Sequence, residues 1–186
     1  MKQLLLLLFI PALQTLSVNA SAKQPIDTAL NQPAPAFQLK DINGKTVSLA
    51  DYKGKTLVID FWATWCVPCR NSFPAVKMAM EKYQDDPDVK FLFIDTRETA
   101  VNYKELVRKF LADNHYPFHT VFDEKSEDGK MDVNFKKYVM PGIPAKYFID
   151  GNGVIKYQSL GYNTALTTEQ TALEIEKIIE KVKAGK

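Results

Sequence analysis

The sequence predicts a three-layer α/β sandwich built on a mixed β-sheet, and two observations carry this prediction. Apolar runs of strand length alternate along the chain with segments in which apolar residues recur every three or four positions. Such alternation implies helices packed on parallel strands. Near the C-terminus, the turn sequence Asp-Gly-Asn-Gly at residues 150–153 lies between two short apolar runs. It predicts a closing hairpin, which adds antiparallel strands.

Length and charge limit what the chain can be. At 186 residues it is long enough for one domain with a sizeable core and short for two. Its 24 basic and 22 acidic residues nearly cancel, giving a formal net charge of +2. The basic residues show no clustering with aromatic residues, so we expect no nucleic-acid partner. We further expect a monomer without a metal or other cofactor.

The first 22 residues have the three parts of a signal peptide. A short basic start is followed by an apolar stretch at residues 4–13, about half of the roughly 20 residues needed to span a bilayer. Small residues then allow cleavage after Ala20 or after Ala22. We therefore expect the protein to be exported and to work in the periplasm or elsewhere outside the cytoplasm.

The exported chain begins with a lead-in, a hairpin and a buried strand. Residues 23–35 are polar and contain three prolines, which is typical of a linker, so we place the folded domain at residues 36–186. Asn43-Gly44 lies between two alternating runs and predicts a β-hairpin at the start of the domain. Residues 56–62 are apolar nearly throughout, as expected of a strand buried on both faces of a parallel sheet.

The rest of the chain alternates between helices and strands. Apolar residues at helical spacing predict a helix from residue 68 to about 83, which Pro74 should kink near its start. Thr167 and Gln170 form a capping-box pattern at the start of a final helix. The remaining elements are expected as a strand at 89–95, a helix around 103–111, a short strand at 119–123, a helical segment around 131–138, hairpin strands at 145–149 and 154–160, and the last helix at 168–183.

The only two cysteines, Cys66 and Cys69, lie where the buried strand at 56–62 leads into a helix. Two cysteines are too few to form a disulfide scaffold in a domain of this size, and so short a loop removes little entropy from the unfolded chain. A helix N-terminus lowers the pKa of a thiol, and the thiolate is the attacking species. The pair therefore predicts redox chemistry rather than a stabilising crosslink.

The spacing of the cysteines suggests separate roles for them. Cys66, at the mouth of the helix, is expected to be the exposed nucleophile. Cys69, one turn further on, is expected to attack the resulting mixed disulfide and release the product. A structural zinc site is disfavoured because there is no second Cys-x-x-Cys pair. Arg70 stands where c-type haem attachment needs a histidine.

Three motifs resemble the thioredoxin superfamily, and the likeness runs from about residue 37 to the C-terminus. Val-Ile-Asp-Phe-Trp-Ala-Thr-Trp-Cys-Val-Pro-Cys at 58–69 resembles its active-site strand and motif. Leu-Ala-Asp-Tyr-Lys-Gly-Lys at 49–55 is similar to the lead-in of the extracytoplasmic TlpA/ResA-type thiol–disulfide oxidoreductases. Residues 142–153 are similar to the cis-proline segment and closing hairpin. The resemblance implies a thioredoxin-like α/β/α sandwich with an N-terminal β-hairpin.

The resemblance also implies a substrate groove beside the cysteines. In the family, the proline that matches Pro144 is cis and the residue before it, here Ile143, faces the nucleophile and binds an incoming peptide. From the residues alone, Pro144 is only a proline at a strand start, where it is tolerated. Trp65, Val67 and Pro68 surround the thiols in sequence and are expected to complete the substrate-binding surface.

Two carboxylates complete the predicted site. Asp60 is the lone acid in the apolar strand, and burial would raise its pKa toward neutrality, which suits a proton acceptor. It matches the family's buried acid, which implies that it accepts the proton of Cys69; the alternative is a buried acid satisfied by hydrogen bonds. Glu98 matches a functional glutamate of ResA-like proteins, and the alternative is a solvated loop residue.

We expect an enzyme that reduces disulfides of client proteins, such as an apocytochrome c or another envelope protein, and that a membrane-bound donor recharges. A dithiol oxidase is the first alternative. A thiol peroxidase would need Pro-x-x-x-Thr-x-x-Cys, but Ala63 stands three residues before Cys66, and Cys66 itself three before Cys69. A copper-binding chaperone would favour a Cys-x-x-x-Cys spacing with an added histidine, which the chain does not clearly offer.

Overall fold

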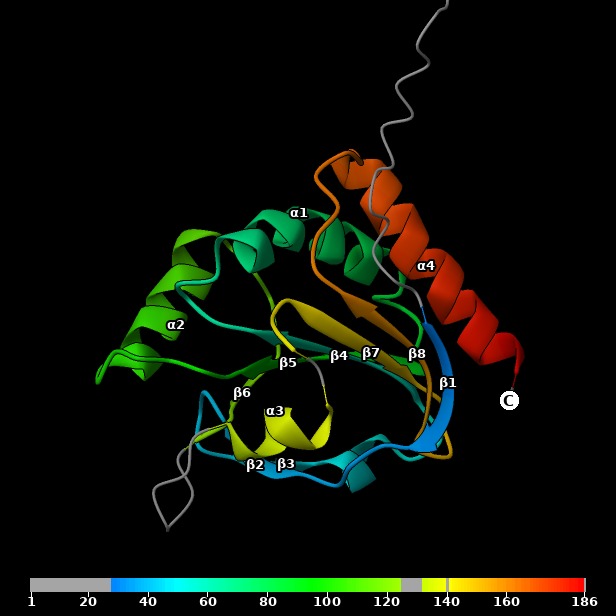
Figure 1. Cartoon of the computed structure of the whole chain (residues 1–186), viewed down its shortest axis with the longest axis horizontal. Coiled ribbons are helices and arrows are strands. Elements are labelled where there is room, and N and C mark those ends of the chain that lie inside the picture. The colour runs from blue at the N-terminus through cyan, green and yellow to red at the C-terminus, as the bar shows by residue number, and fades with distance from the viewer. Residues whose placement is uncertain (1–27, 125–131, 140, 186) are drawn as a thin grey trace, which may run out of the picture.

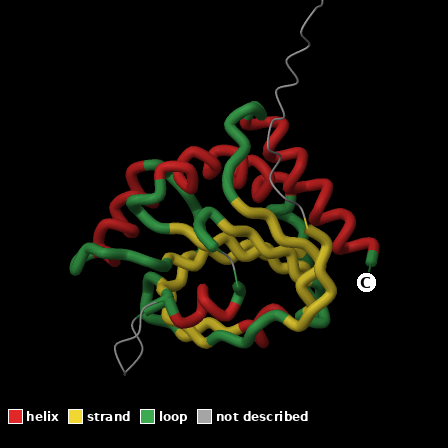
Figure 2. The backbone as a smooth tube through the Cα atoms, in the orientation of Figure 1, coloured by secondary structure: helices red, strands yellow, loops and turns green. Residues whose placement is uncertain are grey.

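A mixed β-sheet forms the middle of the molecule (Figures 1 and 2). The computed structural model describes residues 28–124, 132–139 and 141–185. The predicted signal peptide, the first part of the predicted lead-in and residue 131 lie outside these ranges. The strands in the described residues are β1 Thr28–Pro33, β2 Gln38–Asp41, β3 Thr46–Ser48, β4 Thr56–Trp62, β5 Val89–Asp95, β6 Thr120–Phe122, β7 Ala145–Ile149 and β8 Val154–Leu160.

The strand order in the described residues is β1-β8-β7-β4-β5-β6-β2-β3. Strand β4 pairs in parallel with β5, and β5 pairs in parallel with β6. Strand β7 pairs antiparallel with both β4 and β8. The mixed sheet with parallel central strands and a closing antiparallel hairpin is confirmed. Because β4 lies near the middle of the sheet, the cysteines that follow it lie over the centre of one sheet edge.

Helices cover both faces of this sheet and make the predicted three layers (Figure 1). One face carries α1 (Val67–Lys82), α2 (Tyr103–Asp113) and α4 (Thr168–Ala184). The other face carries the short α3 (Val133–Lys137) and the 3-10 turn η1 (Leu49–Tyr52). Across the described residues, no helix combines the length and the hydropathy needed to span a bilayer.

Each face of the sheet has its own hydrophobic core. On the face of α1, α2 and α4, Trp62 and Phe73 are fully buried and their rings lie 5.1 Å apart. On the face of α3, Phe61 lies 5.3 Å from Phe135. Successive residues of a strand point to opposite faces, so Phe61 and Trp62 serve different cores. Trp62 is thus a core residue and does not belong to the accessible surface around the cysteines.

The segment Thr28–Pro33 corrects the prediction that residues 23–35 form only a lead-in. It forms β1, which pairs antiparallel with β8 at the edge of the sheet, with a break in register between Ala29 and Gln32. An edge strand forms hydrogen bonds on one side only and can therefore accept a proline such as Pro33. Because β1 carries mostly exposed residues, its sequence lacks the apolar alternation that identifies a strand.

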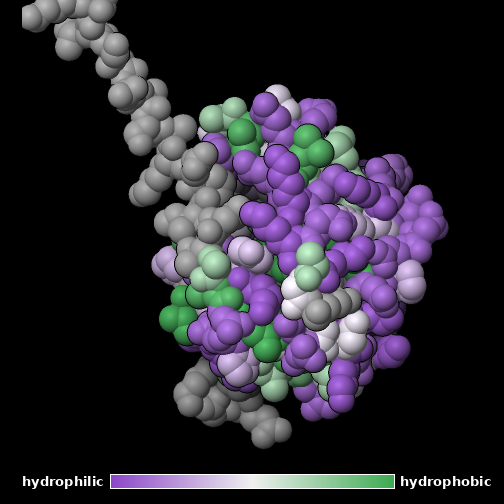
Figure 3. All heavy atoms as spheres, turned by 90° about the vertical axis from the view of Figure 1, so that its right-hand side faces the viewer, coloured by the Kyte–Doolittle hydropathy of each residue, from purple (hydrophilic) through white to green (hydrophobic). Residues whose placement is uncertain are grey.

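Local signals at two other places are confirmed. The β2–β3 hairpin turns at Asn43-Gly44, where Gly44 has φ +83°, a conformation that glycine adopts without strain. Thr167 caps α4 by accepting a hydrogen bond from the Gln170 amide, and the Gln170 side chain accepts one from the Thr167 amide. The side of the molecule that carries β1 and the end of α4 is mostly hydrophilic (Figure 3).

Candidate active site

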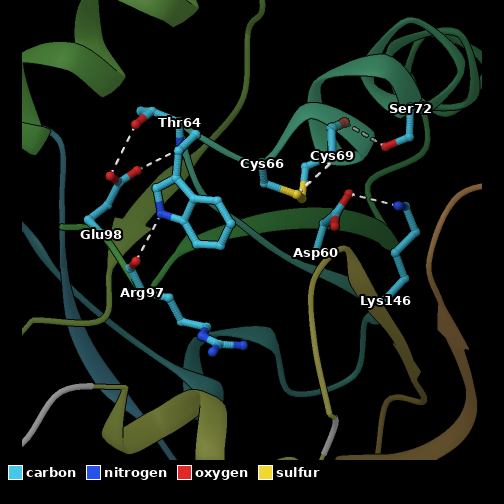
Figure 4. The surroundings of a disulfide bond; sticks show 9 residues. Asp60, Thr64, Cys66, Cys69, Ser72, Arg97, Glu98 and Lys146 are labelled. Atoms are coloured by element: carbon cyan, nitrogen blue, oxygen red, sulfur yellow. Dashed lines mark hydrogen bonds and ion pairs between the residues drawn. A yellow bond between two sulfur atoms is a disulfide. The ribbon is translucent and has the colours of Figure 1, made fainter. Parts of the chain in front are cut away.

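Cys66 and Cys69 form a disulfide at the start of α1, with their Cα atoms 5.3 Å apart (Figure 4). Cys66 is the N-cap of the helix, and its Sγ accepts a hydrogen bond from the Cys69 amide at 3.2 Å. Pro68 occupies the first turn, where its missing N–H costs no helical hydrogen bond. The amides of the first turn and the positive end of the helix dipole therefore favour a thiolate on Cys66 after reduction.

The exposure of Cys66 differs from the prediction. Cys66 is 2% exposed and Cys69 is fully buried, so the expectation of an exposed Cys66 is wrong for this oxidised form. The disulfide ties the Cys66 sulfur to Cys69, which lies on the buried side of the first helical turn. The Cys66 side chain therefore turns toward the interior and not toward solvent. The neighbouring Trp65 and Val67 are exposed instead, at 49% and 53%. Together with the exposed Pro68 they form an apolar rim around the disulfide.

The loop after β5 holds Trp65 in this rim. The Trp65 indole N–H donates to the backbone oxygen of Arg97 at 2.9 Å. Arg97 itself has φ +58°, and its amide donates to a carboxylate oxygen of Asp132, just before α3. A segment far along the chain therefore fixes the orientation of an exposed tryptophan, which reduces the entropy that Trp65 would lose on binding a partner.

Ile143 and Pro144 lie at the start of β7, beside β4. Their peptide bond is cis, as the family resemblance implied. Pro144 is buried, while Ile143 is half-buried and packs against the core cluster that contains both cysteines. Ile143 also packs against the core cluster on the opposite face of the sheet, and its predicted role in binding a client peptide stays a prediction.

Asp60 lies on the α1 face of β4 and is 2% exposed. Its Oδ2 lies 3.1 Å from Nζ of Lys146, a cross-strand neighbour on β7 (Figure 4). Burial raises the pKa of Asp60, and the Lys146 ammonium opposes part of that rise. The predicted burial is confirmed, and the partner of the carboxylate among the described residues is the Lys146 ammonium.

Glu98 also lies at the site and is buried rather than solvated. Its two carboxylate oxygens accept hydrogen bonds from the Thr64 amide at 2.5 Å and from the Thr64 hydroxyl at 3.0 Å (Figure 4). Thr64 belongs to the loop between β4 and Cys66, so Glu98 holds the backbone that presents the disulfide. The neighbouring Asp95 has its pKa raised to about 10. Burial is the main cause, and the negative charge of Glu98 is the second.

Sequence reasoning missed Lys146 and Asp95. A signal for Lys146 was present, since it is the one charged residue in an otherwise apolar strand at 145–149. Pairing it with Asp60 also required the strand register, which the sequence does not supply. Asp95 ends a strand that was predicted correctly, but its contact with Glu98 depends on the path of the loop.

The described residues contain no group of three histidine, cysteine, aspartate or glutamate side chains arranged to hold a metal ion. What the site offers is a disulfide at a helix N-terminus, a buried acid behind it and an apolar rim in front. A thiolate at this place can attack a disulfide, and the second thiol can resolve the product. Fold and site together define a dithiol–disulfide exchange protein.

The comparisons with known proteins agree. Residues 30–158 match the model of the AhpC/TSA family, and the chain belongs to that family. It is 30% identical over 159 residues to the thiol:disulfide interchange protein DsbE of Pseudomonas fluorescens biotype C, covering 83% of this chain and 80% of the relative. It is 28% identical over 153 residues to the thiol-disulfide oxidoreductase ResA of Bacillus thuringiensis subsp. konkukian (strain 97-27), covering 82% and 78%.

A solved structure is similar over a comparable share of the chain. It is the crystal structure of a putative thiol:disulfide interchange protein DsbE from Chlorobium tepidum, with a TM-score of 0.64 and 30% identity, covering 80% of this chain and 94% of that one. The thioredoxin-like fold and the DsbE/ResA-type relationship are thereby confirmed. The protein is a thiol–disulfide oxidoreductase with a Cys-Val-Pro-Cys redox disulfide.

Proposed function

We propose that the protein reduces disulfides of client proteins outside the cytoplasm. One observation carries this proposal: the Cys66–Cys69 disulfide caps a helix N-terminus and is surrounded by the exposed apolar side chains of Trp65 and Val67. Aromatic and aliphatic groups that are fixed and exposed are typical of a surface that binds a polypeptide. The rim, together with Pro68, Ile143 and Pro144, would hold the client segment next to the sulfur atoms.

The reaction follows from the positions of the two cysteines. In the reduced protein, the Cys66 thiolate attacks one sulfur of a client disulfide, and the electron pair of the broken bond leaves on the other client sulfur. Cys69 then loses its proton and attacks Cys66, which releases the second client thiolate and forms the disulfide seen here. Each turnover moves two electrons from the protein to the client.

Asp60 is the group we propose as acceptor of the Cys69 proton. It is buried on the sheet face against which α1 packs, and its carboxylate points toward the cysteines (Figure 4). The raised pKa of Asp60 brings it closer to the thiol pKa, which makes the transfer of a proton between the two groups easier. Glu98 would act as a modulator, because it holds Thr64 and with it the loop before Cys66.

The setting of the reaction rests on the N-terminal sequence. A signal peptide would place the protein where no soluble thiol pool is assured, so a membrane-bound donor would return the electrons. The names of the DsbE and ResA relatives specify disulfide interchange and thiol–disulfide oxidoreduction for those proteins. Among clients, an apocytochrome c fits the TlpA/ResA-type resemblance, because its two cysteines must be reduced before haem is attached.

A paired assay tests the direction of the reaction. The protein should speed the reduction of insulin disulfides by dithiothreitol, and its oxidised form should be a poor oxidant of a reduced, unfolded protein with native disulfides. Heat-treated protein controls for free thiols. The proposal would be wrong if the oxidised form restored disulfides quickly while insulin reduction stayed at the uncatalysed rate, since that is the behaviour of a dithiol oxidase.

A further inference from the structure

The loop that follows β5 binds the segment in front of Cys66 at two places (Figure 4). The Glu98 carboxylate accepts hydrogen bonds from both the amide and the hydroxyl of Thr64. One residue earlier in the same loop, the Arg97 backbone oxygen accepts from the indole N–H of Trp65. The position of this loop therefore determines how the residues just before Cys66 are presented.

Asp95 ends β5 and forms a side-chain hydrogen bond with Glu98. It is 1% exposed, and no N–H or O–H group of the described residues donates to either of its oxygens. Two carboxylates only accept hydrogen bonds, so a bond between Asp95 and Glu98 requires a proton on one of them. Both oxygens of Glu98 already accept from Thr64, which assigns the proton to Asp95.

The strands around Asp95 favour its neutral form. Burial is the largest cause that raises the pKa of Asp95, and the negative charges of Glu98 and Asp123 add to it. Asp123, which follows β6, accepts hydrogen bonds from the Thr96 hydroxyl and from amides at the start of α3. The cross-strand neighbour on β4 is Trp62, which carries no charge. No positive charge therefore reaches Asp95 from the sheet.

Helix α2 also supplies no cation to Asp95. Its two basic residues at the cavity beside Asp95 already have partners, since Lys104 pairs with Glu124 and Arg108 donates to the Ile42 backbone oxygen at 2.8 Å. Asp95 thus has no cation partner in the part of the chain that the structure describes. The titratable residues that line the cavity from α2 and from the end of β6 are Tyr103, Lys104, Glu105, Arg108, Asp123 and Glu124.

We propose that Asp95 is a positioning residue for disulfide exchange: its neutral carboxyl donates a hydrogen bond to Glu98, and Glu98 in turn fixes the Thr64–Trp65 segment in front of Cys66. This inference rests on the proposed function, because it assigns a role within the same site. Two buried carboxylates side by side are unfavourable when both are charged. A neutral Asp95 removes this repulsion and supplies the donor that a second carboxylate lacks.

Two substitutions of Asp95 separate the hydrogen-bond donor from the volume of the side chain. Asp95→Asn keeps a neutral donor of the same shape and should reduce insulin at the wild-type rate. Asp95→Leu fills a similar space without a donor. It should slow insulin reduction about tenfold, because a small misplacement of the groups that orient a substrate costs that much or more. The same two substitutions at Asp113, an exposed acid 2.9 Å from Lys109, are matched controls and should change nothing.

Two measurements show whether Asp95 acts through Glu98 and the segment before Cys66. The chain has two tryptophans, so the indole N–H signal of Trp65 can be assigned in an NMR spectrum with the help of Trp65→Phe. In Asp95→Leu this signal should move toward that of a solvated indole, whereas in Asp95→Asn it should stay in place. In a Glu98→Gln background, Asp95→Leu should have little further effect on insulin reduction, because both substitutions break the same contact.

The pH dependence of stability tests the proton on Asp95 without an activity assay. The pKa of Asp95 is raised from its ordinary value of 3.8 to about 10 in the folded protein, so folding takes up a proton between these values. The wild type should therefore lose stability relative to Asp95→Asn as the pH rises. Between about pH 5 and 7, its unfolding equilibrium constant divided by that of Asp95→Asn should rise about tenfold per pH unit. Urea unfolding measures this ratio, which stays informative if Asp95→Leu fails to fold.

The outcomes separate this inference from the proposed function. If the wild type does not speed insulin reduction, the proposed function itself is wrong. If the wild type is active and folded Asp95→Leu matches it in rate and in the Trp65 signal, or if Asp95→Asn is as slow as Asp95→Leu, the role of Asp95 is refuted and the proposed function stands. An equal loss in the Glu98→Gln background would refute the path through Glu98. A ratio of unfolding constants that is the same at every pH would refute the neutral form of Asp95.

Discussion

The Cys69→Ser variant is expected to accumulate a stable mixed disulfide with its client through Cys66, whereas Cys66→Ser should form none. Cys66 begins the reaction because it caps α1 and lies next to the exposed rim, while Cys69 is fully buried one turn further on. Without Cys69 nothing inside the protein can attack the mixed disulfide. The complex can be detected by non-reducing electrophoresis and mass spectrometry after mixing the reduced variant with insulin.

Turnover should fall to the uncatalysed rate in both variants, because each lacks one of the two sulfur atoms that the cycle needs. The double variant Cys66→Ser/Cys69→Ser is the control for trapping through noncovalent binding and should give no covalent complex. If either single variant retained full insulin reductase activity, the two-thiol mechanism would be incorrect. A complex formed through Cys69 in Cys66→Ser would reverse the assignment of the two roles.

Asp60→Asn is expected to slow the resolving step by roughly 10²-fold at neutral pH, the lower end of what a positioned general base contributes. The amide keeps the shape of the side chain but cannot accept the proton of Cys69. Reaction of the reduced protein with the disulfide of thionitrobenzoate measures this step, because attack by Cys66 releases the first thionitrobenzoate in one phase and resolution by Cys69 releases the second in a later phase. The second phase should slow, and the first phase should change little. Asp88→Asn, which alters an acid in a surface pair with Lys55, is the matched control and should leave both phases unchanged.

The same variant makes a prediction about stability. Burial raises the pKa of Asp60 above its ordinary value of 3.8, so the folded state binds this proton more tightly than the unfolded state does. The contribution of Asp60 to the free energy of unfolding therefore falls as the pH rises from 3.8 through its folded pKa. Asp60→Asn should lack this decline. If the difference between variant and wild type, measured by urea unfolding, were the same at every pH, Asp60 would have an unshifted pKa.

Most elements of the fold could be predicted because their signals are local. The buried strand at 56–62, the cysteines after it and the capping box at Thr167 each depend on residues close together in sequence. Strand β1 could not be found in this way. Its residues are exposed at a sheet edge, and its pairing with β8 joins segments more than 100 positions apart. Hydrophobic periodicity carries no information about such a strand.

The site was predictable where one residue carries the chemistry and unpredictable where two distant residues share it. The positions of the cysteines and the burial of Asp60 follow from the motif and its apolar surroundings. The contacts of Asp60 with Lys146 and of Glu98 with Thr64 depend on strand register and loop path. The burial of Cys66 was missed because the sequence does not show which way its sulfur turns when the disulfide forms.

The reduction potential of the Cys66–Cys69 pair tests the central claim most directly. It can be measured by equilibrating the protein with glutathione or dithiothreitol buffers and counting free thiols by alkylation. A reductant of client disulfides should have a potential near the roughly −270 mV of thioredoxin. A value near the roughly −120 mV of a strong dithiol oxidase would contradict the account, because electrons would then flow from the client to this protein.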